Sequence, residues 1–224
     1  MSETGRPQRL VFVTGTATEV GKTWVGAALL SLAREREMAV AARKPAQSYQ
    51  PPEATDAQRL AAASGEQPDV VCPPELSYPV PMAPPMAAQA LGREVPTIGA
   101  LATLIRQSWM VAGVGLTTSD AIELALVEGA GGVASPLAAD GDSADLARML
   151  RADRVVLVAD PALGVINAVR LSVAALRPLP VVVHLNRYDP GDDLQHRNAA
   201  WLRDRDGFTV TTSVAELLEV LTVR

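Results

Sequence analysis

Short apolar runs alternate along this chain with longer segments whose apolar residues recur every three or four positions. The apolar runs predict strands, and the three-to-four spacing predicts amphipathic helices. The predicted strands span residues 10–13, 38–43, 122–127, 154–159, 180–185 and 208–210. The predicted helices span residues 22–35, 54–63, 87–91, 98–110, 142–150, 165–176, 194–205 and 213–221. This alternation, at spacings that suit βαβ crossovers, predicts an α/β fold with a mostly parallel, doubly wound sheet and helices on both faces.

One segment, residues 72–85, interrupts this pattern with six prolines. Because each proline fixes φ and removes a backbone donor, the segment is expected to be an ordered but irregular loop. Gln47 and Ser48 are placed in another loop, which follows the strand that Lys44-Pro45 ends. Periodic segments continue on both sides of the Pro-rich loop, so residues 1–224 are expected to form one P-loop domain.

Composition and charge narrow the functional classes. The 224 residues are 48% apolar, and the formal net charge of −5 without a Lys/Arg-rich run argues against a nucleic-acid partner. The single cysteine, Cys72, rules out an internal disulfide framework. No stretch approaches the ~20 apolar residues of a membrane span, and the polar start MSETGRPQR is unlike a signal peptide. We therefore expect a cytoplasmic protein with no membrane partner.

The stretch LVFVTGTATEVGKT, residues 10–23, carries the strongest chemical signal. A short strand leads into a glycine-containing turn, and GKT then opens a helix, which is the context of a P-loop. In such a loop the backbone N–H groups face a polyphosphate, the lysine reaches the outer phosphates and the threonine hydroxyl binds Mg²⁺. Gly15 lies one position earlier than in the usual G-x-x-x-x-G-K-[ST], so Thr16 stands where glycine is expected. The alternative is a surface turn that contains GKT by chance, which the flanking strand and helix disfavour.

Two acids and a second lysine are predicted at the same edge of the sheet. Glu128 ends a strand and precedes the glycines of residues 129–132, as in a Walker B position, although it could also be a solvated acid in a turn. Lys44 precedes a proline and therefore ends its strand in extended geometry. Asp56 begins a helix, where the helix dipole alone could account for an acid. Thr23, Asp56 and Glu128 are thus three candidate ligands for one Mg²⁺, which suits an ion that keeps waters and phosphate oxygens.

Five segments together resemble the dethiobiotin synthetase family of biotin biosynthesis. They are GTATEVGKT (15–23), Lys44-Pro45, Thr55-Asp56-Ala57, VEGAGG (127–132) and LGVINAVRL (163–171). They follow the family's order over most of the chain, and their combination is specific where any one alone would not be. The resemblance implies a Mg²⁺-dependent homodimer whose substrates are diaminopelargonate, CO₂ or bicarbonate, and ATP or another nucleoside triphosphate.

The reaction implied by the resemblance is an ATP-dependent ring closure. One amine of 7,8-diaminopelargonic acid takes up CO₂ as a carbamate, which attacks the γ-phosphate to give a carbamic-phosphoric anhydride. The second amine then displaces phosphate, and the products are dethiobiotin, ADP and phosphate.

The resemblance also assigns roles to residues through the matching motifs. The catalytic residues are Lys44, which would contact carbamate and γ-phosphate, and Lys22 of the phosphate loop. The metal ligands are Thr23, Asp56 and Glu128. The nucleotide-binding residues are Glu19, Val20, Gly21, Lys22, Thr23, Asp56, Glu128, Gly129, Ala130, Gly131 and Asn186, the last of which would read the nucleobase. The substrate-binding residues are Thr16, Ser48, Gly164, Val165, Ile166 and Asn167, of which the last four form a helix start that the partner subunit contributes.

Three features depart from the family pattern. Ala17 stands where Asp is common, Met82-Ala83-Pro84-Pro85 replaces a Ser-Pro-His segment near the substrate, and no Pro-Trp-Leu segment follows Asp206, so the nucleobase stays open. Ala17 also occupies the position where partitioning-type P-loop ATPases, the main alternative, carry an additional lysine. An amide-forming synthetase of the cobyrinate type would need a glutaminase domain with a cysteine nucleophile. A non-catalytic nucleotide-binding module is disfavoured by the lysine and acids at the sheet edge.

Overall fold

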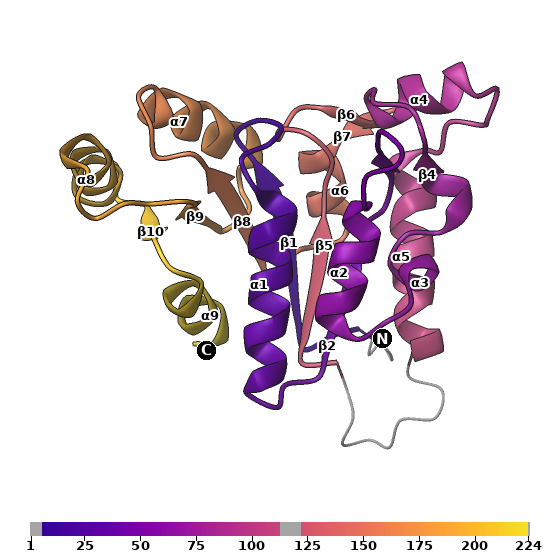
Figure 1. Cartoon of the computed structure of the whole chain (residues 1–224), viewed down its shortest axis with the longest axis horizontal. Helices are drawn as coiled ribbons and strands as arrows, with labels where there is room; N and C mark the ends of the chain where they lie inside the picture. The colour runs from indigo at the N-terminus through magenta and orange to yellow at the C-terminus, as the bar shows by residue number, and fades with distance from the viewer. Residues whose placement is uncertain (1–5, 113–121, 224) are drawn as a thin grey trace.

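A six-stranded parallel sheet forms the centre of the computed structural model, which describes residues 6–112 and 122–223 (Figure 1). Its strand order is β10-β9-β8-β1-β5-β2. The strands are β1 (Arg9–Gly15), β2 (Val40–Arg43), β5 (Leu124–Glu128), β8 (Arg154–Ala159), β9 (Val181–Leu185) and β10 (Thr209–Thr211). The predicted α/β class with a doubly wound parallel sheet is confirmed. The polar residues 1–5, on which the expectation about a signal peptide partly rests, lie outside the described residues.

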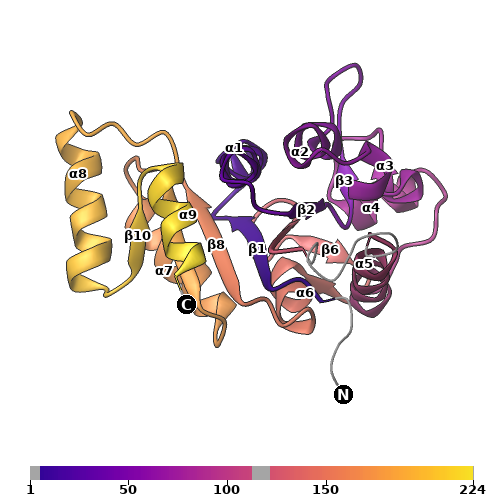
Figure 2. The same ribbon diagram turned by 90° about the horizontal axis from the view of Figure 1, so that it is seen from below.

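Helices cover both faces of this sheet. α1 and α9 pack against each other on one face, whereas α6 and α7 lie on the other (Figure 2). The helices are α1 (Lys22–Glu35), α2 (Asp56–Ser64), α3 (Pro68–Val71), α4 (Pro84–Ala90), α5 (Ile98–Ala112), α6 (Ser143–Met149), α7 (Val165–Leu176), α8 (Asp193–Ala200) and α9 (Val214–Thr222), with a π-helical turn at Trp201–Arg205. Among the described residues, no helix is long and apolar enough to cross a membrane.

Continuous burial explains why the central strands read as unbroken apolar runs. All five residues of β5 are buried, and so are six of the seven residues of β1. A parallel strand covered by helices on both faces has no solvent side, so it loses the alternating pattern of a half-exposed strand. Strand β1, which leads into the P-loop, pairs with β5 on one side and with β8 on the other. The P-loop is therefore held rigidly at the middle of the sheet.

The expectation of an irregular loop over residues 72–85 is wrong in part. The segment contains a 3₁₀ turn at Pro74–Leu76, the short strand β4 (Ser77–Tyr78) and the start of α4. Two prolines occupy the first turn of α4, where a missing N–H removes no helical hydrogen bond. The loop expected around Gln47–Ser48 is also corrected, because these residues form the short strand β3, which pairs with β4.

Other differences concern boundaries and short elements. Helix α2 begins at Asp56 because the Thr55 side chain accepts the N–H of Gln58 as an N-cap. Strand β5 extends to Glu128, one residue beyond the predicted end. The helix predicted over 194–205 is α8 followed directly by the π-helical turn. Helix α3 and the hairpin of β6 (Pro136–Ala138) and β7 (Gly141–Asp142) were not predicted, since elements of two to four residues show no periodicity.

The outer edge of β2 is bound by Glu66, which follows α2, and by Val71 at the end of α3, instead of by another strand. The Glu66 carboxylate accepts the N–H of Ala42 at 2.7 Å and pairs with the Arg43 guanidinium, also at 2.7 Å. The N–H of Lys44 donates to the carbonyl of Val71 at 2.7 Å. The bonds from Ala42 and Lys44 satisfy two backbone N–H groups that would otherwise be open to another chain. They also fix the backbone that carries Lys44 relative to helix α2.

His184 on β9 is buried at 2% exposure, and its Nδ1 lies 3.0 Å from the Thr211 hydroxyl. This contact gives one ring nitrogen of the buried imidazole a hydrogen-bond partner within the fold. Burial lowers the pKa of His184 to about 4 and outweighs the opposing effect of the Glu216 carboxylate. The folded state therefore holds a neutral imidazole under conditions in which an unfolded chain would already be protonated.

The low pKa of His184 predicts a loss of stability in acid. Below about pH 6.5 the unfolded chain binds a proton that the folded chain resists, so stability falls from there until the pH approaches 4. We expect His184→Gln to remove roughly 3 kcal/mol of the decrease in unfolding free energy between pH 7 and pH 4. Urea unfolding of the natural protein and of both variants across this pH range measures the effect. His196→Gln, which replaces an exposed histidine, is the control. Equal pH dependence in all three proteins would contradict the prediction.

Candidate active site

The carboxyl ends of the central strands open into one large cleft of about 1570 Å³. Its walls come from the P-loop, the start of α1, the segment after β2, the start of α2, the loop before α4, and the ends of β9 and β10. Open α/β sheets bind ligands at this edge, where loops from adjacent strands diverge. Of the predicted site residues, those that line the cleft are Glu19, Gly21, Lys22, Thr23, Lys44, Ser48, Asp56, Ala130, Gly131 and Asn186.

The P-loop connects β1 to α1 in a conformation that leaves the helix start free for an anion. Gly21 is the N-cap of α1 at φ 92°, a left-handed value suited to glycine, and no side chain caps the helix. Glu19 also has a positive φ, of 61°, the kind of strain that functional loops retain. The Lys22 Nζ donates to the carbonyl of Ala17 at 3.0 Å, within the same loop. Burial and the nearby Lys44 ammonium lower the pKa of Lys22.

Three oxygen-bearing side chains from different elements converge beside the P-loop. The Thr23 hydroxyl lies 2.9 Å from Asp56 Oδ1 and 2.9 Å from Glu128 Oε1. A hydroxyl has one proton, so it can donate to only one of these two carboxylates. Glu128 lies wholly beneath the cleft surface, and its Oε2 has no hydrogen-bond partner among the described residues. This set of hydroxyl and carboxylate oxygens fits Mg²⁺, which prefers oxygen ligands and takes few from the protein.

Lys44 belongs to the same cluster. Its Nζ contacts Glu128 Oε1 at 2.5 Å, Asp56 Oδ2 at 2.8 Å and the carbonyl of Gly129 at 3.0 Å. Burial alone would lower the pKa of Lys44, but the two carboxylates raise it above its ordinary value. Lys44 is therefore a protonated ammonium held at the floor of the cleft, with only 2% of its surface exposed.

The two carboxylates respond in opposite directions to this shared environment. Burial would raise the pKa of Asp56, but the Lys44 ammonium and the hydrogen bonds from Lys44 and Thr23 hold it below its usual range. Burial raises the pKa of the more deeply placed Glu128, and Lys44 opposes this only in part. Among the residues that the structure describes, no three His, Cys, Asp or Glu side chains gather to hold a metal. Any cation here would rely on two carboxylates and a hydroxyl.

Both lysines of the chain lie at this cleft. Lys22 and Lys44 are the only lysines among its 20 Lys and Arg residues. A lysine ammonium is compact and can turn between several acceptors, whereas a planar guanidinium has a fixed geometry. The two positions that carry a movable ammonium are thus the two that meet at the cleft.

The predicted substrate residues fall into two groups. Ser48 lines the cleft, and its Oγ is buried with no hydrogen-bond partner among the described residues. The divergent segment Met82–Pro84 lines the same part of the cleft and leads into α4. In contrast, Thr16 and Gly164–Asn167 do not contribute to the cleft of this chain.

Asn186 has a contact that its sequence position did not indicate. Its Nδ2 donates to the carbonyl of Val20 at 2.9 Å, so the side chain braces the P-loop from β9. A Cβ on Gly21 would lie only 2.1 Å from this Nδ2, which makes glycine necessary there. Sequence reasoning missed this brace because Val20 and Asn186 are separated by 166 positions in the chain. Val20 and Gly129 support the loop and Lys44 without lining the cleft.

The parallel sheet, the phosphate loop and the acid at the end of β5 define a P-loop nucleoside triphosphatase fold. The family of AAA domains designated AAA_26 matches residues 9–195. The chain is 41% identical over 191 residues to the ATP-dependent dethiobiotin synthetase BioD of Anaeromyxobacter dehalogenans (strain 2CP-C), covering 83% of this chain and 79% of that protein. It is 36% identical over 205 residues to the BioD of Xanthomonas euvesicatoria pv. vesicatoria (strain 85-10), covering 87% and 85%. The chain belongs to the ATP-dependent dethiobiotin synthetase family.

Solved structures of more distant proteins share the fold alone. Chloroplast FtsY from Physcomitrella patens has a TM-score of 0.55 at 13% identity, and the match covers 97% of this chain and 66% of FtsY. A plasmid partition protein from Borrelia burgdorferi also has a TM-score of 0.55, at 12% identity, covering 96% and 98%. At these identities the likeness to a partition protein gives no support to a partitioning function.

Proposed function

We propose that this protein closes the cyclic urea of dethiobiotin from 7,8-diaminopelargonic acid and CO₂, with ATP converted to ADP and phosphate. The observation that carries the proposal is the meeting of Lys44, Asp56, Glu128 and Thr23 beside the P-loop. Phosphoryl transfer depends largely on positioning and on neutralising charge, and this cluster provides both. The membership of the family supplies the substrate.

The reaction would bring two anions together, and the two lysines fit that need. A carbamate formed on one amine attacks the γ-phosphorus, the bond to the β-phosphate oxygen breaks, and ADP leaves. The second amine attacks the carbonyl carbon of the mixed anhydride, phosphate departs, and the ring closes. Lys22 would bind the outer phosphates from the loop. Lys44 would contact carbamate and γ-phosphate together, offsetting the negative charge that accumulates as they approach.

Thr23, Asp56 and Glu128 are the residues that would hold Mg²⁺. When bound, the ion would neutralise charge on the phosphates. Glu128 is anchored in β5 and Asp56 at the first turn of α2, so both carboxylates are held by rigid elements. Such support keeps ligand oxygens in place without an ordering cost on binding.

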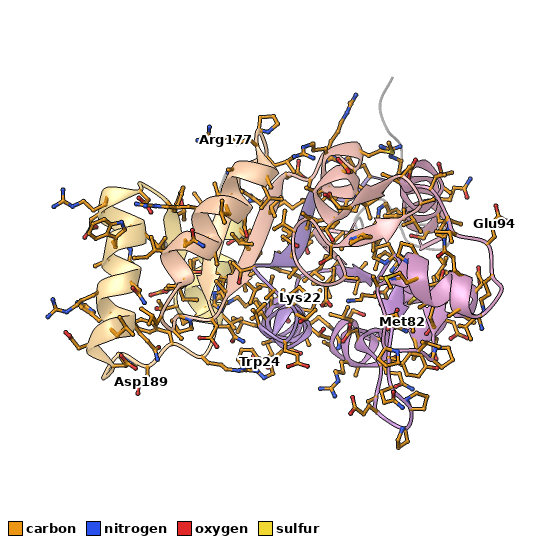
Figure 3. The ribbon with its side chains drawn as sticks, turned by 90° about the horizontal axis from the view of Figure 1, so that it is seen from above. Lys22, Trp24, Met82, Glu94, Arg177 and Asp189 are labelled. Carbon is orange, nitrogen blue, oxygen red and sulfur yellow. The ribbon has the colours of Figure 1, made fainter. Side chains whose placement is uncertain are left out.

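A magnesium titration tests these ligands. We expect Asp56→Asn combined with Glu128→Gln to raise the Mg²⁺ concentration for half-maximal activity at least roughly tenfold, because both anionic ligands are lost. Glu94→Gln removes an exposed acid that does not line the cleft and lies at the edge of the molecule, away from Lys22 (Figure 3), so it should leave the titration unchanged. An unaltered titration in the double variant would remove both acids from the ligand set.

The substrate site would be completed by a second copy of the chain. Helix α7 begins at Gly164 without a side-chain cap, which leaves free N–H groups suited to a carboxylate, yet this start lies outside the cleft of its own chain. Two leucines of the same region are exposed, Leu163 at 85% and Leu171 at 65%. A homodimer would cover these apolar side chains and present Gly164–Asn167 to the partner's cleft.

Phosphate release tests the proposed function. The protein is incubated with ATP, Mg²⁺ and bicarbonate, with and without diaminopelargonate. We expect release to depend on the diamine and to cease when bicarbonate is removed. Release at an equal rate without the diamine would contradict the synthetase and would favour a P-loop ATPase of the partitioning type.

A further inference from the structure

The two ends of the cleft differ, and this difference indicates where the base of a bound nucleotide would lie. Lys44, Asp56 and Glu128, which mark the end where phosphoryl transfer would occur, lie on the β5 and β2 side of the P-loop. Strand β9 lies on the other side of β1 in the sheet. A triphosphate whose terminal group meets Lys44 therefore extends its nucleoside toward the end of β9.

Trp24 lies on that side of helix α1. A Cβ on Gly21 would collide with Asn186 at the end of β9, so this side of Gly21 faces β9. Residues three apart share one face of a helix, so Trp24 lies on the same face as Gly21. Seen from above, Trp24 lies on the side of α1 toward Asp189, whereas Met82 lies on the opposite side (Figure 3). Trp24 lines the cleft, as do Arg187 and Tyr188, which follow β9.

The exposure of this tryptophan is unusual for so large an apolar side chain. Trp24 is 62% exposed although it follows the P-loop directly, whereas Trp109 is buried beneath the Arg43 guanidinium. The third tryptophan, Trp201, does not line the cleft. Thr212, Ser213 and Val214, which lead from β10 into α9, line the same part of the cleft and are smaller. Trp24 is thus the largest planar surface available at the nucleoside end.

We propose that the indole of Trp24 stacks on the base of the bound nucleotide and supplies much of its affinity. This inference rests on the proposed function, because it needs the triphosphate to lie in the P-loop. Aromatic side chains stack on any base through its π-face, and this contact needs no hydrogen-bond pattern. Trp24 would then hold the base while Asn186 braces the loop.

Binding of ATP and of inorganic tripolyphosphate separates a base contact from an effect on the loop. We expect Trp24→Ala to weaken ATP binding roughly tenfold in calorimetry and to change tripolyphosphate binding less than about twofold. Trp24→Phe keeps a smaller ring, so its affinity for ATP should lie between that of Trp24→Ala and that of the natural protein. Because Trp24 is largely exposed, its truncation leaves no buried cavity, and circular dichroism checks the fold.

Tryptophan fluorescence gives an independent readout. We expect ATP to quench the emission of the natural protein and of Trp201→Phe, and tripolyphosphate to cause little quenching. Equal weakening of both ligands in Trp24→Ala would assign Trp24 to the loop and overturn the proposal, as would unchanged ATP binding. If the natural protein uses ATP in a diamine-dependent way while Trp24→Ala binds it normally, only this inference fails. If phosphate release ignores the diamine, the synthetase function fails and the stacking contact is judged by the binding data alone.

Discussion

Lys44→Ala is expected to lower kcat by at least about a thousandfold while ATP binding stays within a few-fold of the natural protein. The reason lies in the position of the ammonium. Lys44 is buried at the floor of the cleft, next to the two carboxylates and not in the phosphate loop. Its removal takes away the charge that would hold carbamate and γ-phosphate together, but leaves the backbone cradle for the nucleotide intact. Single-turnover phosphate release and calorimetry measure the two effects.

Two further variants separate charge from packing at this position. Lys44→Met keeps most of the buried stem and should lose activity like the alanine variant, although it avoids the cavity that alanine leaves. Lys44→Arg keeps the charge, but a planar guanidinium cannot take the compact place between three oxygen atoms, so we expect no rescue. Near-normal turnover in both Lys44→Ala and Lys44→Met would show that the role given to Lys44 is wrong.

Lys22→Ala is expected to abolish turnover in a different way, by weakening nucleotide binding together with the chemical step. Lys22 lies in the first turn of α1 and its Nζ reaches back to the carbonyl of Ala17, across the space that the loop encloses. Loss of this ammonium removes the charge that faces the outer phosphates. We expect ATP affinity to fall at least roughly tenfold, whereas Lys44→Ala keeps it. Arg36→Ala removes an exposed positive charge just after the same helix and is the matched control.

The two lysines can also be observed directly. Because the chain has no other lysine, selective ¹⁵N labelling of lysine gives two side-chain signals, and each alanine variant assigns one of them. ATP is expected to shift the Lys22 signal in the Lys44→Ala variant. A Lys22 signal that does not respond to ATP would contradict the contact with phosphate.

Much of the fold could be predicted because long elements have a strong period. The helix over 22–35 and the strand over 154–159 have the predicted bounds. The helix covers the sheet with its apolar face, and the strand is part of the sheet, so both have clear apolar patterns. Residues 72–85 depart from the irregular loop predicted for them. Proline is disfavoured in the interior of a helix or a sheet, but it is accepted in the first turn of a helix, as in α4. The sequence alone does not distinguish a proline in a first turn from a proline in a loop.

The candidate site was predictable to the extent that motifs define positions at the sheet edge. Thr23, Asp56 and Glu128 were expected near one another, and the structure brings them into contact. The ion pairs of Lys44 with both acids and the brace from Asn186 to Val20 were not predicted. Such contacts depend on the order of strands in the sheet and on the depth of each side chain. A one-dimensional pattern contains neither.

We expect one chain to couple ATP cleavage to closure of a cyclic urea. The most direct measurement follows the carbon and the phosphate together, with ¹³C-bicarbonate, ATP, Mg²⁺ and diaminopelargonate, and products detected by mass spectrometry and ¹³C NMR. We expect one ADP and one phosphate for each dethiobiotin, with the label in the ring carbonyl. ATP cleavage without labelled dethiobiotin, under conditions in which the protein is folded and binds ATP, would contradict the account.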